Sequence, residues 1–505
     1  MIVKDRYMEL IEAFPLRPIR SDRDLARATE LAGRLAVNAR LTRGQQDYLD
    51  VLSDLIERYE AAPGPARRSE AAGLMSGVRL LRNVGRPVMR ILQRREFLGI
   101  LGVGTTWGTA AVAAAGEGAA TLPAAGPADV QTYASGRDDG RFLQTAALVH
   151  KYMQTLQPKL AFRPGMTREE FPAWQKAVRE KLLELMCFPE VSKQPEPNRI
   201  WSQAREGYRL ERWEAYPEPF SVAPFLLLIP DGVSPSSPAP AVLCFPGSTG
   251  SKETLAGEPE LPGSPAPDKT KWSDNRMAYH FARRGLVAAA FDSPATNELA
   301  SPMLNREALS LCAIWMGRCY EAISVFQKAC VLPWLAAQPY VDAKRVATSG
   351  HSLGAKPADV LGVLYPELVQ AVVHNDFVCH WQERAVAMNL YHPGGHQVVP
   401  GMVQWFDYTD LEAALAPRPL LFTEGGRPNQ IAKIRRAYAL LDAAGAVRVY
   451  HYEKYEDPAS RTLDDAELPV GISGEQYFAY AYVDAARHRF RPHHAVPWLA
   501  GVFGM

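Results

Sequence analysis

One serine in the chain stands in a spacing that can make it a nucleophile. Gly350-His-Ser-Leu-Gly354 is a G-x-S-x-G pentapeptide, with an apolar run at residues 345–348 before it and helical spacing at 355–364 after it. A strand, a tight turn and a helix in that order expose the serine hydroxyl at a helix N-terminus, and the two glycines allow the turn to close. The sequence therefore predicts a nucleophile elbow with Ser352 at its tip.

A serine hydroxyl needs a neighbouring base to remove its proton, and histidine suits this task because its pKa lies near neutrality. Around an elbow of this kind the order along the chain is serine, acid, histidine. His488 lies in a loop before the last predicted helix, after every predicted strand. We therefore expect His488 to be the base, with His493 and His494 as competitors.

The acid of such a triad orients the histidine and holds its tautomer. Glu424 follows the predicted strand at 419–423 and opens a Glu-Gly-Gly loop that can turn its carboxylate toward the histidine. Asp376, at the end of the preceding predicted strand, is the alternative acid. The sequence thus predicts a Ser352–Glu424–His488 triad, with Asp376 in reserve.

An oxyanion intermediate needs two N–H donors that are fixed in advance. The backbone N–H of Leu353, directly after the nucleophile, is one expected donor. The other is expected from the loop after the apolar strand at 241–245, at Ser248 or its neighbour Thr249.

Aromatic side chains gather in the segment between residues 376 and 419, which we expect to lie over the active site. Trp381, Tyr391 and Trp405 are the candidate substrate-binding residues, because aromatic faces can stack on a sugar or an acyl group. Packing in the core accounts for them equally well.

Two acidic residues follow the predicted strand at 286–291. Asp292 and Glu298 are expected to line the same pocket. The nearby Gly250-Ser-Lys252 lacks the G-x-x-x-x-G-K-[ST] spacing of a phosphate-binding loop, so nucleotide binding is not expected.

Composition narrows the function classes. The 505 residues carry a net charge of +1, which gives no general attraction to nucleic acid or to an anionic membrane. The six cysteines form no C-x-x-C pair and no H-E-x-x-H motif is present, so neither a metal nor a cofactor is expected. Cys312 and Cys319 fall on one face of a single predicted helix at 305–337, where we expect buried thiols.

From residue 201 onward, predicted strands alternate with predicted helices, and this alternation indicates a mostly parallel sheet covered on both faces. Two opening strands, at 208–216 and 222–229, are expected to form an antiparallel pair at its edge. Residues 126–200 have helical spacing and are predicted to pack on this domain as an extension.

The chain from 201 to 505 resembles the α/β hydrolases of the dienelactone-hydrolase and acetyl-xylan-esterase type. The resemblance rests on Pro-Gly-Ser-Thr-Gly-Ser-Lys252, Asp342-Ala-Lys-Arg-Val-Ala347, the G-H-S-L-G elbow, Ala416-Pro-Arg-Pro-Leu-Leu-Phe422 and the late His488. It implies an α/β-hydrolase fold of about eight strands and a serine carboxylic-ester hydrolase. Two features depart from the family pattern: Ala355-Lys356 replaces the second small residue that is common after the elbow, and Glu424 comes earlier in the chain than the aspartate of many relatives.

The resemblance also implies the substrate, a small-molecule or polysaccharide ester, with acylated carbohydrate as the expectation if the protein is exported. Two alternatives stay open. One is a serine peptidase of the prolyl-oligopeptidase kind, and the other is a non-catalytic binding protein with a hydrolase fold.

The segment at 89–125 resembles a twin-arginine export signal. Arg94-Arg95 precedes Phe97-Leu98 and a weakly apolar Gly/Ala-rich run to Ala115. If translation starts at Met89 the protein is predicted to be periplasmic or secreted, and otherwise cytoplasmic. The run is too weakly hydrophobic to predict a stable membrane span.

The first 62 residues are charged and helical in pattern, and residues 63–88 are a predicted Pro/Gly/Arg-rich linker. Residues 12–20 and 47–56 resemble the N-terminal arm of helix-turn-helix antitoxins. The DNA-binding helices of that family do not follow, so DNA binding is not expected here.

Overall fold

The computed structural model describes residues 133 and 135–505 apart from 259, 262–274 and 392–393, together with α2 (Asp22–Ala36) and scattered positions between 10 and 56. The chain divides into two compact units, Met1–Ala119 and Ala120–Met505. In the first unit the small residues Ala28 and Ala32 of α2 are buried beside Tyr48 and Leu52. The export-signal segment at 89–125 lies outside the described residues, and the likeness to an antitoxin arm stays a prediction.

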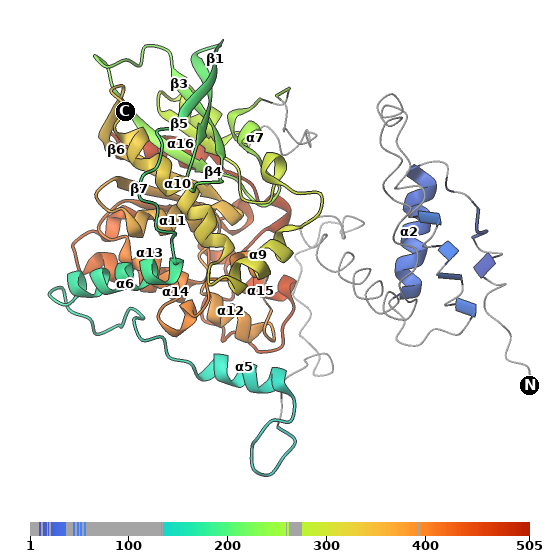
Figure 1. The fold of residues 1–505 in the computed structure, drawn as a ribbon. Coiled ribbons are helices and arrows are strands. Elements are labelled where there is room, and N and C mark those ends of the chain that lie inside the picture. Colours follow the sequence, from blue (N-terminus) through green and yellow to red (C-terminus); the bar gives the residue numbers. More distant parts are fainter. Residues whose placement is uncertain are drawn as a thin grey trace, which may run out of the picture. The chain divides into compact units, whose positions relative to one another are not determined.

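The second unit is built on a nine-stranded sheet in the order β1-β2-β3-β5-β4-β6-β7-β8-β9 (Figure 1). Its strands are β1 (Asn198–Arg205), β2 (Tyr208–Ala215), β3 (Ala223–Pro230), β4 (Ala239–Phe245), β5 (Val287–Phe291), β6 (Val341–His351), β7 (Val369–Asn375), β8 (Leu420–Phe422) and β9 (Val447–Val449). The strands from β5 to β9 in this order are parallel, and β1, β2 and β3 add an antiparallel edge. The α/β-hydrolase fold predicted from the sequence is confirmed.

The strand beyond the predicted eight is β1, at the outer edge. Six of its eight residues are exposed and only two are half-buried, so its sequence lacks the alternation of apolar and polar residues that predicts a strand. Its pairing with β2 comes from the backbone ladder, which the side-chain pattern does not reveal.

The prediction of a single long helix at 305–337 is wrong, because two helices that meet at an angle of 91° occupy this range. It forms α9 (Arg306–Trp315) and α10 (Tyr320–Ala336), separated by Gly317 at φ 77°. Glycine adopts this left-handed conformation without steric cost, and the turn there ends α9. The break also overturns the expectation that Cys312 and Cys319 are both buried on one face of a single helix. Cys312 is exposed on α9, whereas Cys319 is buried as the N-cap of α10.

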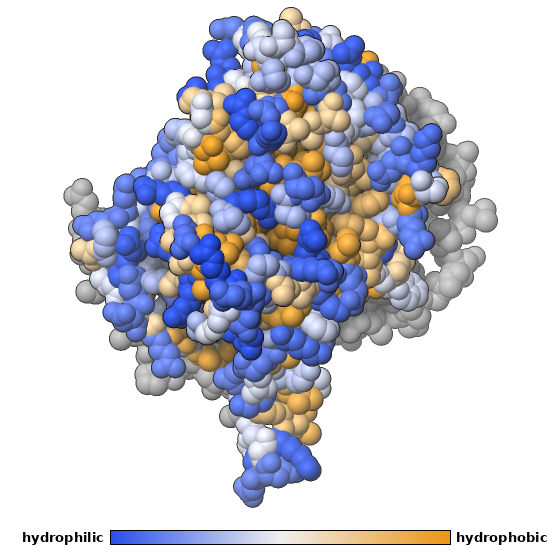
Figure 2. All heavy atoms as spheres, turned by 90° about the vertical axis from the view of Figure 1, so that its left-hand side faces the viewer, coloured by the Kyte–Doolittle hydropathy of each residue, from blue (hydrophilic) through white to orange (hydrophobic). Residues whose placement is uncertain are grey.

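The helical extension belongs partly to the core of this unit. In α6 (Phe171–Met186), Phe171, Val178, Leu182 and Met186 recur on one face and are fully buried with the sheet residues. The preceding α5 (Thr145–Thr155) instead carries exposed apolar residues such as Tyr152. The face drawn in Figure 2 likewise mixes apolar and polar residues.

The remaining helices cover the sheet and enclose the ends of its strands (Figure 1). They are α7 (Lys252–Ala256), α8 (Met277–Arg283), α11 (Ala355–Leu364), α12 (Trp381–Ala387), α13 (Tyr408–Ala414), α14 (Pro428–Ala439), α15 (Gly474–Tyr480) and α16 (Pro492–Val502). Among the described residues no single helix is long and apolar enough to cross a membrane; only the bent pair α9 and α10 reaches that length and composition together.

Candidate active site

Ser352 lies in a sharp turn between β6 and α11. Its φ is +53°, a left-handed conformation that a residue other than glycine rarely adopts. A Cβ on Gly350 would lie 1.9 Å from the carbonyl oxygen of Gly354, and a Cβ on Gly354 would lie 2.4 Å from that of Phe245. Both positions therefore require glycine, because backbone atoms occupy the space.

The loop after β4 lies directly against this turn. A Cβ on Gly247 would lie 2.8 Å from Nδ1 of His351 and 3.4 Å from Cβ of Ser352. The next residue, Ser248, accepts a 3.0 Å hydrogen bond through its carbonyl from Nη2 of Arg306 in α9. The backbone of Ser248 is thus held beside the turn that carries Ser352 and Leu353, which is where a second oxyanion donor is needed.

His488 and Glu424 are in contact. Nδ1 of His488 lies 2.6 Å from Oε2 of Glu424, and the backbone N–H of Arg489 donates to Oε1 of the same carboxylate at 3.3 Å. Glu424 is completely buried, and a carboxylate in such a place needs donors of this kind. Since a carboxylate only accepts, Nδ1 carries the hydrogen and Nε2 is left as the basic nitrogen.

The loop after Glu424 closes tightly. Gly425 has φ +74°, and a Cβ there would lie 2.6 Å from Nδ1 of His451. The backbone N–H of Gly425 donates to the carbonyl of Tyr450 at 2.8 Å. These contacts hold the position of the buried carboxylate.

The alternative acid also approaches the histidine. Oδ1 of Asp376 lies 4.0 Å from Nδ1 of His488, too far for a direct hydrogen bond. The competing histidines contact other groups: the ring of His494 stacks on Tyr450 at 3.9 Å and lies 4.1 Å from that of His493. Of the three late histidines, His488 is the one in contact with Glu424.

His351, which the sequence analysis did not single out, packs on His488. Their ring centroids are 4.8 Å apart. Burial, and then the neighbouring His488, lowers the pKa of His351 well below its usual value, so this ring is neutral at ordinary pH. The sequence offered one signal for this residue: His351 stands directly before Ser352, so its ring was bound to lie close to the other residues of the site.

The aromatic candidates are split between two places. Nζ of Lys356, a residue one helical turn after Ser352, lies 3.8 Å from the centre of the Trp381 ring. The same ring also contacts the guanidinium group of Arg384. Tyr391 contacts Arg384 at 5.2 Å. Trp405 lies between Nζ of Lys159 and Nζ of Lys181 in the N-terminal extension, at 4.4 and 4.0 Å.

Lys356, a departure from the family pattern, ties the segment between β7 and β8 to the elbow helix. Besides Trp381, its ammonium contacts the ring of Tyr408 and donates to Gln397. Burial lowers the pKa of Lys356 to about 8, against the opposing effect of Glu321.

Asp292 and Glu298, which were expected to line the pocket, belong to an ion network, and their place in the pocket stays a prediction. Both carboxylates bind Nζ of Lys252, and Glu253 does so as well. Lys252 and Asp292 are buried, so this ion network anchors the loop that follows β4.

Two groups of side chains bring possible metal ligands within 4.8 Å of one another among the described residues. One is His351, Glu424 and His488; the other is Asp359 of α11, His374 of β7 and Glu412 of α13. In each group the imidazole Nδ1 already contacts a carboxylate oxygen, at 2.6 Å for His488 and 2.7 Å for His374. These two contacts are hydrogen bonds inside the protein.

Comparisons with known proteins agree with this architecture. The model of the abhydrolase family matches residues 124–501. The chain is similar to the crystal structure of a candidate acetyl xylan esterase from Bacteroides fragilis, with 36% identity and a TM-score of 0.69, covering 74% of this chain and 98% of that one.

Two further structures are more distant. A glucuronoyl esterase from Solibacter usitatus is 16% identical with a TM-score of 0.45, covering 65% of this chain and 97% of that one. An acetyl xylan esterase from Paenibacillus is 15% identical with a TM-score of 0.35, covering 62% and 99%. No curated protein matches the chain.

Proposed function

The chain belongs to the abhydrolase family, and from this premise we propose that it cleaves carboxylic esters of an acylated carbohydrate through Ser352, His488 and Glu424. Family membership and the 36%-identical relative make it a hydrolase of the serine esterase type. The substrate class and the three residue roles are the proposal.

The observation that carries the proposal is the 2.6 Å contact between His488 and the buried Glu424, together with the packing of the His488 ring on His351, the residue before Ser352. In the proposed reaction Oγ of Ser352 attacks the ester carbonyl while Nε2 of His488 takes its proton. The imidazolium gives that proton to the leaving alcohol, and Glu424 stabilises the charged ring. Water, deprotonated by the same nitrogen, then releases the acid from the acyl-enzyme.

The N–H groups of Leu353 and Ser248 are proposed to hold the oxyanion in both steps. The neutral His351 favours this cycle, because a second charged ring 4.8 Å away would oppose the formation of the imidazolium. The carbohydrate part of the proposal is supported by the 36%-identical relative, which is named as a candidate acetyl xylan esterase.

The peptidase alternative has weaker support. The described residues between 133 and 197 form the helices α5 and α6 and contain no strand, whereas a prolyl oligopeptidase usually places a β-propeller ahead of its hydrolase domain.

A phosphonate probe and acetylated xylan together test the proposal. Wild-type protein is expected to be labelled covalently and to release acetate, and Ser352→Ala to do neither. Labelling without release from a panel of carbohydrate esters would contradict the substrate class. A folded wild-type protein that is not labelled would favour the non-catalytic alternative.

A further inference from the structure

The loop after β4 is a tight turn whose backbone offers two free donors. The backbone N–H of Gly250 donates to the carbonyl of Gly247 at 3.1 Å, which makes residues 247–250 a β-turn, here called the oxyanion turn. The N–H groups of Ser248 and Thr249 stand at its centre, and neither donates to any residue that the structure describes. Both are therefore available to a negatively charged oxygen.

One side chain fixes the central peptide of this turn. Nη2 of Arg306, the first residue of α9, donates to the carbonyl of Ser248 at 3.0 Å. In a planar trans peptide the C=O and N–H groups point in opposite directions, so this bond also fixes the N–H of Thr249. A flip of this peptide would put its oxygen where that N–H now points, and an acceptor there would repel an oxyanion.

The bond to Ser248 is the distinctive contact of Arg306. Among the described residues the guanidinium forms no ion pair, and its Nη1 is buried without an acceptor. The carboxylate of the next residue, Glu307, instead accepts from the N–H of Gly395 at 2.6 Å and contacts the ring of His396. An unpaired guanidinium in such a place is costly. Its charge strengthens the bond to the carbonyl and polarises the peptide, which makes the N–H a better donor.

A second side chain holds the end of the same turn. Nδ2 of Asn297 donates to the carbonyl of Gly250 at 2.7 Å. That carbonyl belongs to the peptide between Gly250 and Ser251, which carries neither of the two free N–H groups. Asn297 and Arg306 therefore hold the same turn through different peptides, and they form a matched pair for a test.

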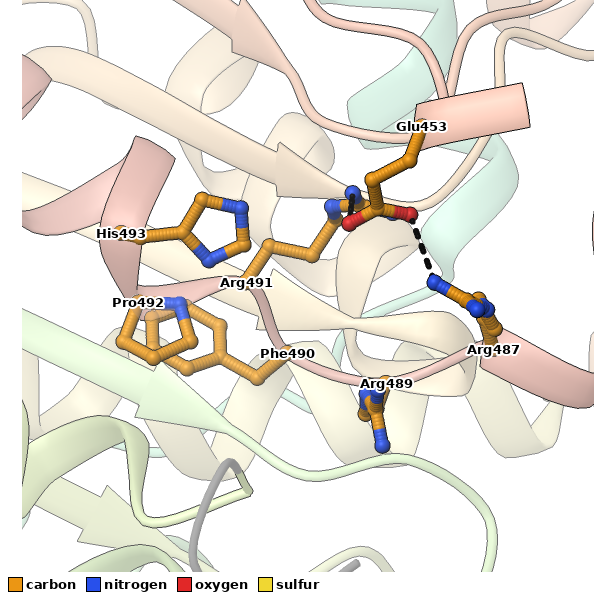
Figure 3. Close-up of a pocket in the computed structure, with 7 residues that line it drawn as sticks. All are labelled: Glu453, Arg487, Arg489, Phe490, Arg491, Pro492 and His493. Carbon is orange, nitrogen blue, oxygen red and sulfur yellow. Dashed lines mark hydrogen bonds and ion pairs between the residues drawn. The ribbon is translucent and has the colours of Figure 1, made fainter. Parts of the chain in front are cut away.

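The loop that carries the base has supports of its own. It lines a pocket of about 200 Å³, in which Glu453 accepts from Arg487 at 3.4 Å and from Arg491 at 2.7 Å (Figure 3). These two arginines stand on either side of His488 in the chain. Loss of Arg306 should therefore disturb the oxyanion turn and leave the base in place.

We propose that Arg306 is a positioning residue for ester hydrolysis. By holding the carbonyl of Ser248, it keeps the N–H groups of the oxyanion turn available to the oxyanion. This inference rests on the proposed function, which uses the turn in this way. Because the oxyanion is absent from the bound ester, Arg306 acts on kcat and leaves KM nearly unchanged.

Steady-state kinetics on phenyl acetate, an activated acetyl ester, measures this role. Removal of a whole oxyanion donor lowers kcat by about 10²–10³. Arg306→Ala leaves the donors present but unheld, so kcat should fall about thirtyfold with KM within about twofold. Asn297→Ala, the matched control, should lose less than about threefold in kcat.

Chemical rescue separates positioning from a general loosening of the loop. Guanidinium ions at millimolar concentration should raise kcat of Arg306→Ala and change neither the wild type nor Asn297→Ala. Arg306→Lys, which keeps a cationic donor, should be more active than Arg306→Gln, and this pair decides the question if Arg306→Ala does not fold by circular dichroism.

Two results would overturn the inference. One is a kcat of Arg306→Ala within about threefold of the wild type. The other is an equal loss in Asn297→Ala without rescue by guanidinium, since the loss would then come from a loosened loop.

The rate of covalent labelling by the phosphonate probe separates this inference from the proposed function, because labelling also builds negative charge on an oxygen beside Ser352. If the wild type is labelled but cleaves no carbohydrate ester, the substrate class is wrong, and slower labelling of Arg306→Ala would still support the inference. Labelling of both at the same rate would overturn it. A folded wild type that is not labelled would overturn the proposed function and this inference together.

Discussion

Nδ1 of His488 lies 2.6 Å from Oε2 of Glu424, which follows the end of β8, whereas Asp376 follows the end of the neighbouring strand β7. The loops after two neighbouring strands therefore each bring an acid toward the same imidazole, at 2.6 Å for Glu424 and 4.0 Å for Asp376.

We expect Glu424→Gln to lower kcat at least a thousandfold, because the amide cannot hold the required tautomer or stabilise the imidazolium. Asp376→Asn should lower it less than tenfold. Steady-state kinetics on an acetyl ester, with circular dichroism to check folding, measures both. A larger loss in Asp376→Asn would make Asp376 the triad acid.

Gly354→Ala should destabilise the protein by about 3 kcal/mol or more, because its Cβ would lie 2.4 Å from a backbone oxygen that cannot rotate away. Gly445→Ala is the matched control, since a Cβ there meets nothing within 4 Å and the change should stay within about 0.5 kcal/mol. Urea denaturation measures both. Equal stabilities of the two variants would mean that the elbow is looser than its geometry indicates.

Glu321 should make the stability fall as pH rises from 4.5 to 7. Burial raises the pKa of its carboxyl to about 7, against the opposing charges of Lys356 and Lys328. In this window the folded chain keeps a proton that the unfolded chain has lost, which costs about 3 kcal/mol by pH 7. Glu321→Gln should flatten the fall, when unfolding free energies are measured at each pH.

The control for that series is Glu180→Gln, an exposed residue of α6 that pairs with Lys176. It should leave the pH dependence of stability unchanged. A wild-type stability that rises between pH 4.5 and 7, or a Glu321→Gln variant with the wild-type slope, would contradict the assignment.

The two tryptophans should behave differently when replaced by alanine. Trp381→Ala is expected to raise KM for acetylated xylan at least fivefold, because its ring lies on Lys356 beside the elbow helix. Trp405→Ala should leave KM within twofold and lower stability by about 2–3 kcal/mol, since it loses its contacts with Lys159 and Lys181. The reverse pattern would place the substrate near the N-terminal extension.

Export remains a prediction of the sequence. Expression from Met89 in a bacterial host should give periplasmic protein whose N-terminus lies after Ala115, and replacing Arg94 and Arg95 with lysine should block its release. Fractionation and N-terminal sequencing measure this. Retention of the unchanged protein in the cytoplasm would exclude a functional signal.

The sequence by itself determined those features of the protein that depend on neighbours along the chain. The elbow could be read from Gly350, Ser352 and Gly354, because the turn needs glycine at fixed positions next to the serine. The alternation of strands and helices in the same way determined the α/β-hydrolase fold, which the structure and the family confirm.

Only the tertiary structure decided which side chains meet. It ranked Glu424 over Asp376, placed Trp405 against the extension, and paired Asp292 with Lys252. The contact between the rings of His351 and His488 and the pocket around Arg491 were likewise decided only by the tertiary structure. These contacts join residues far apart in the chain, and their distances depend on how strands register and loops pack, which no local spacing encodes.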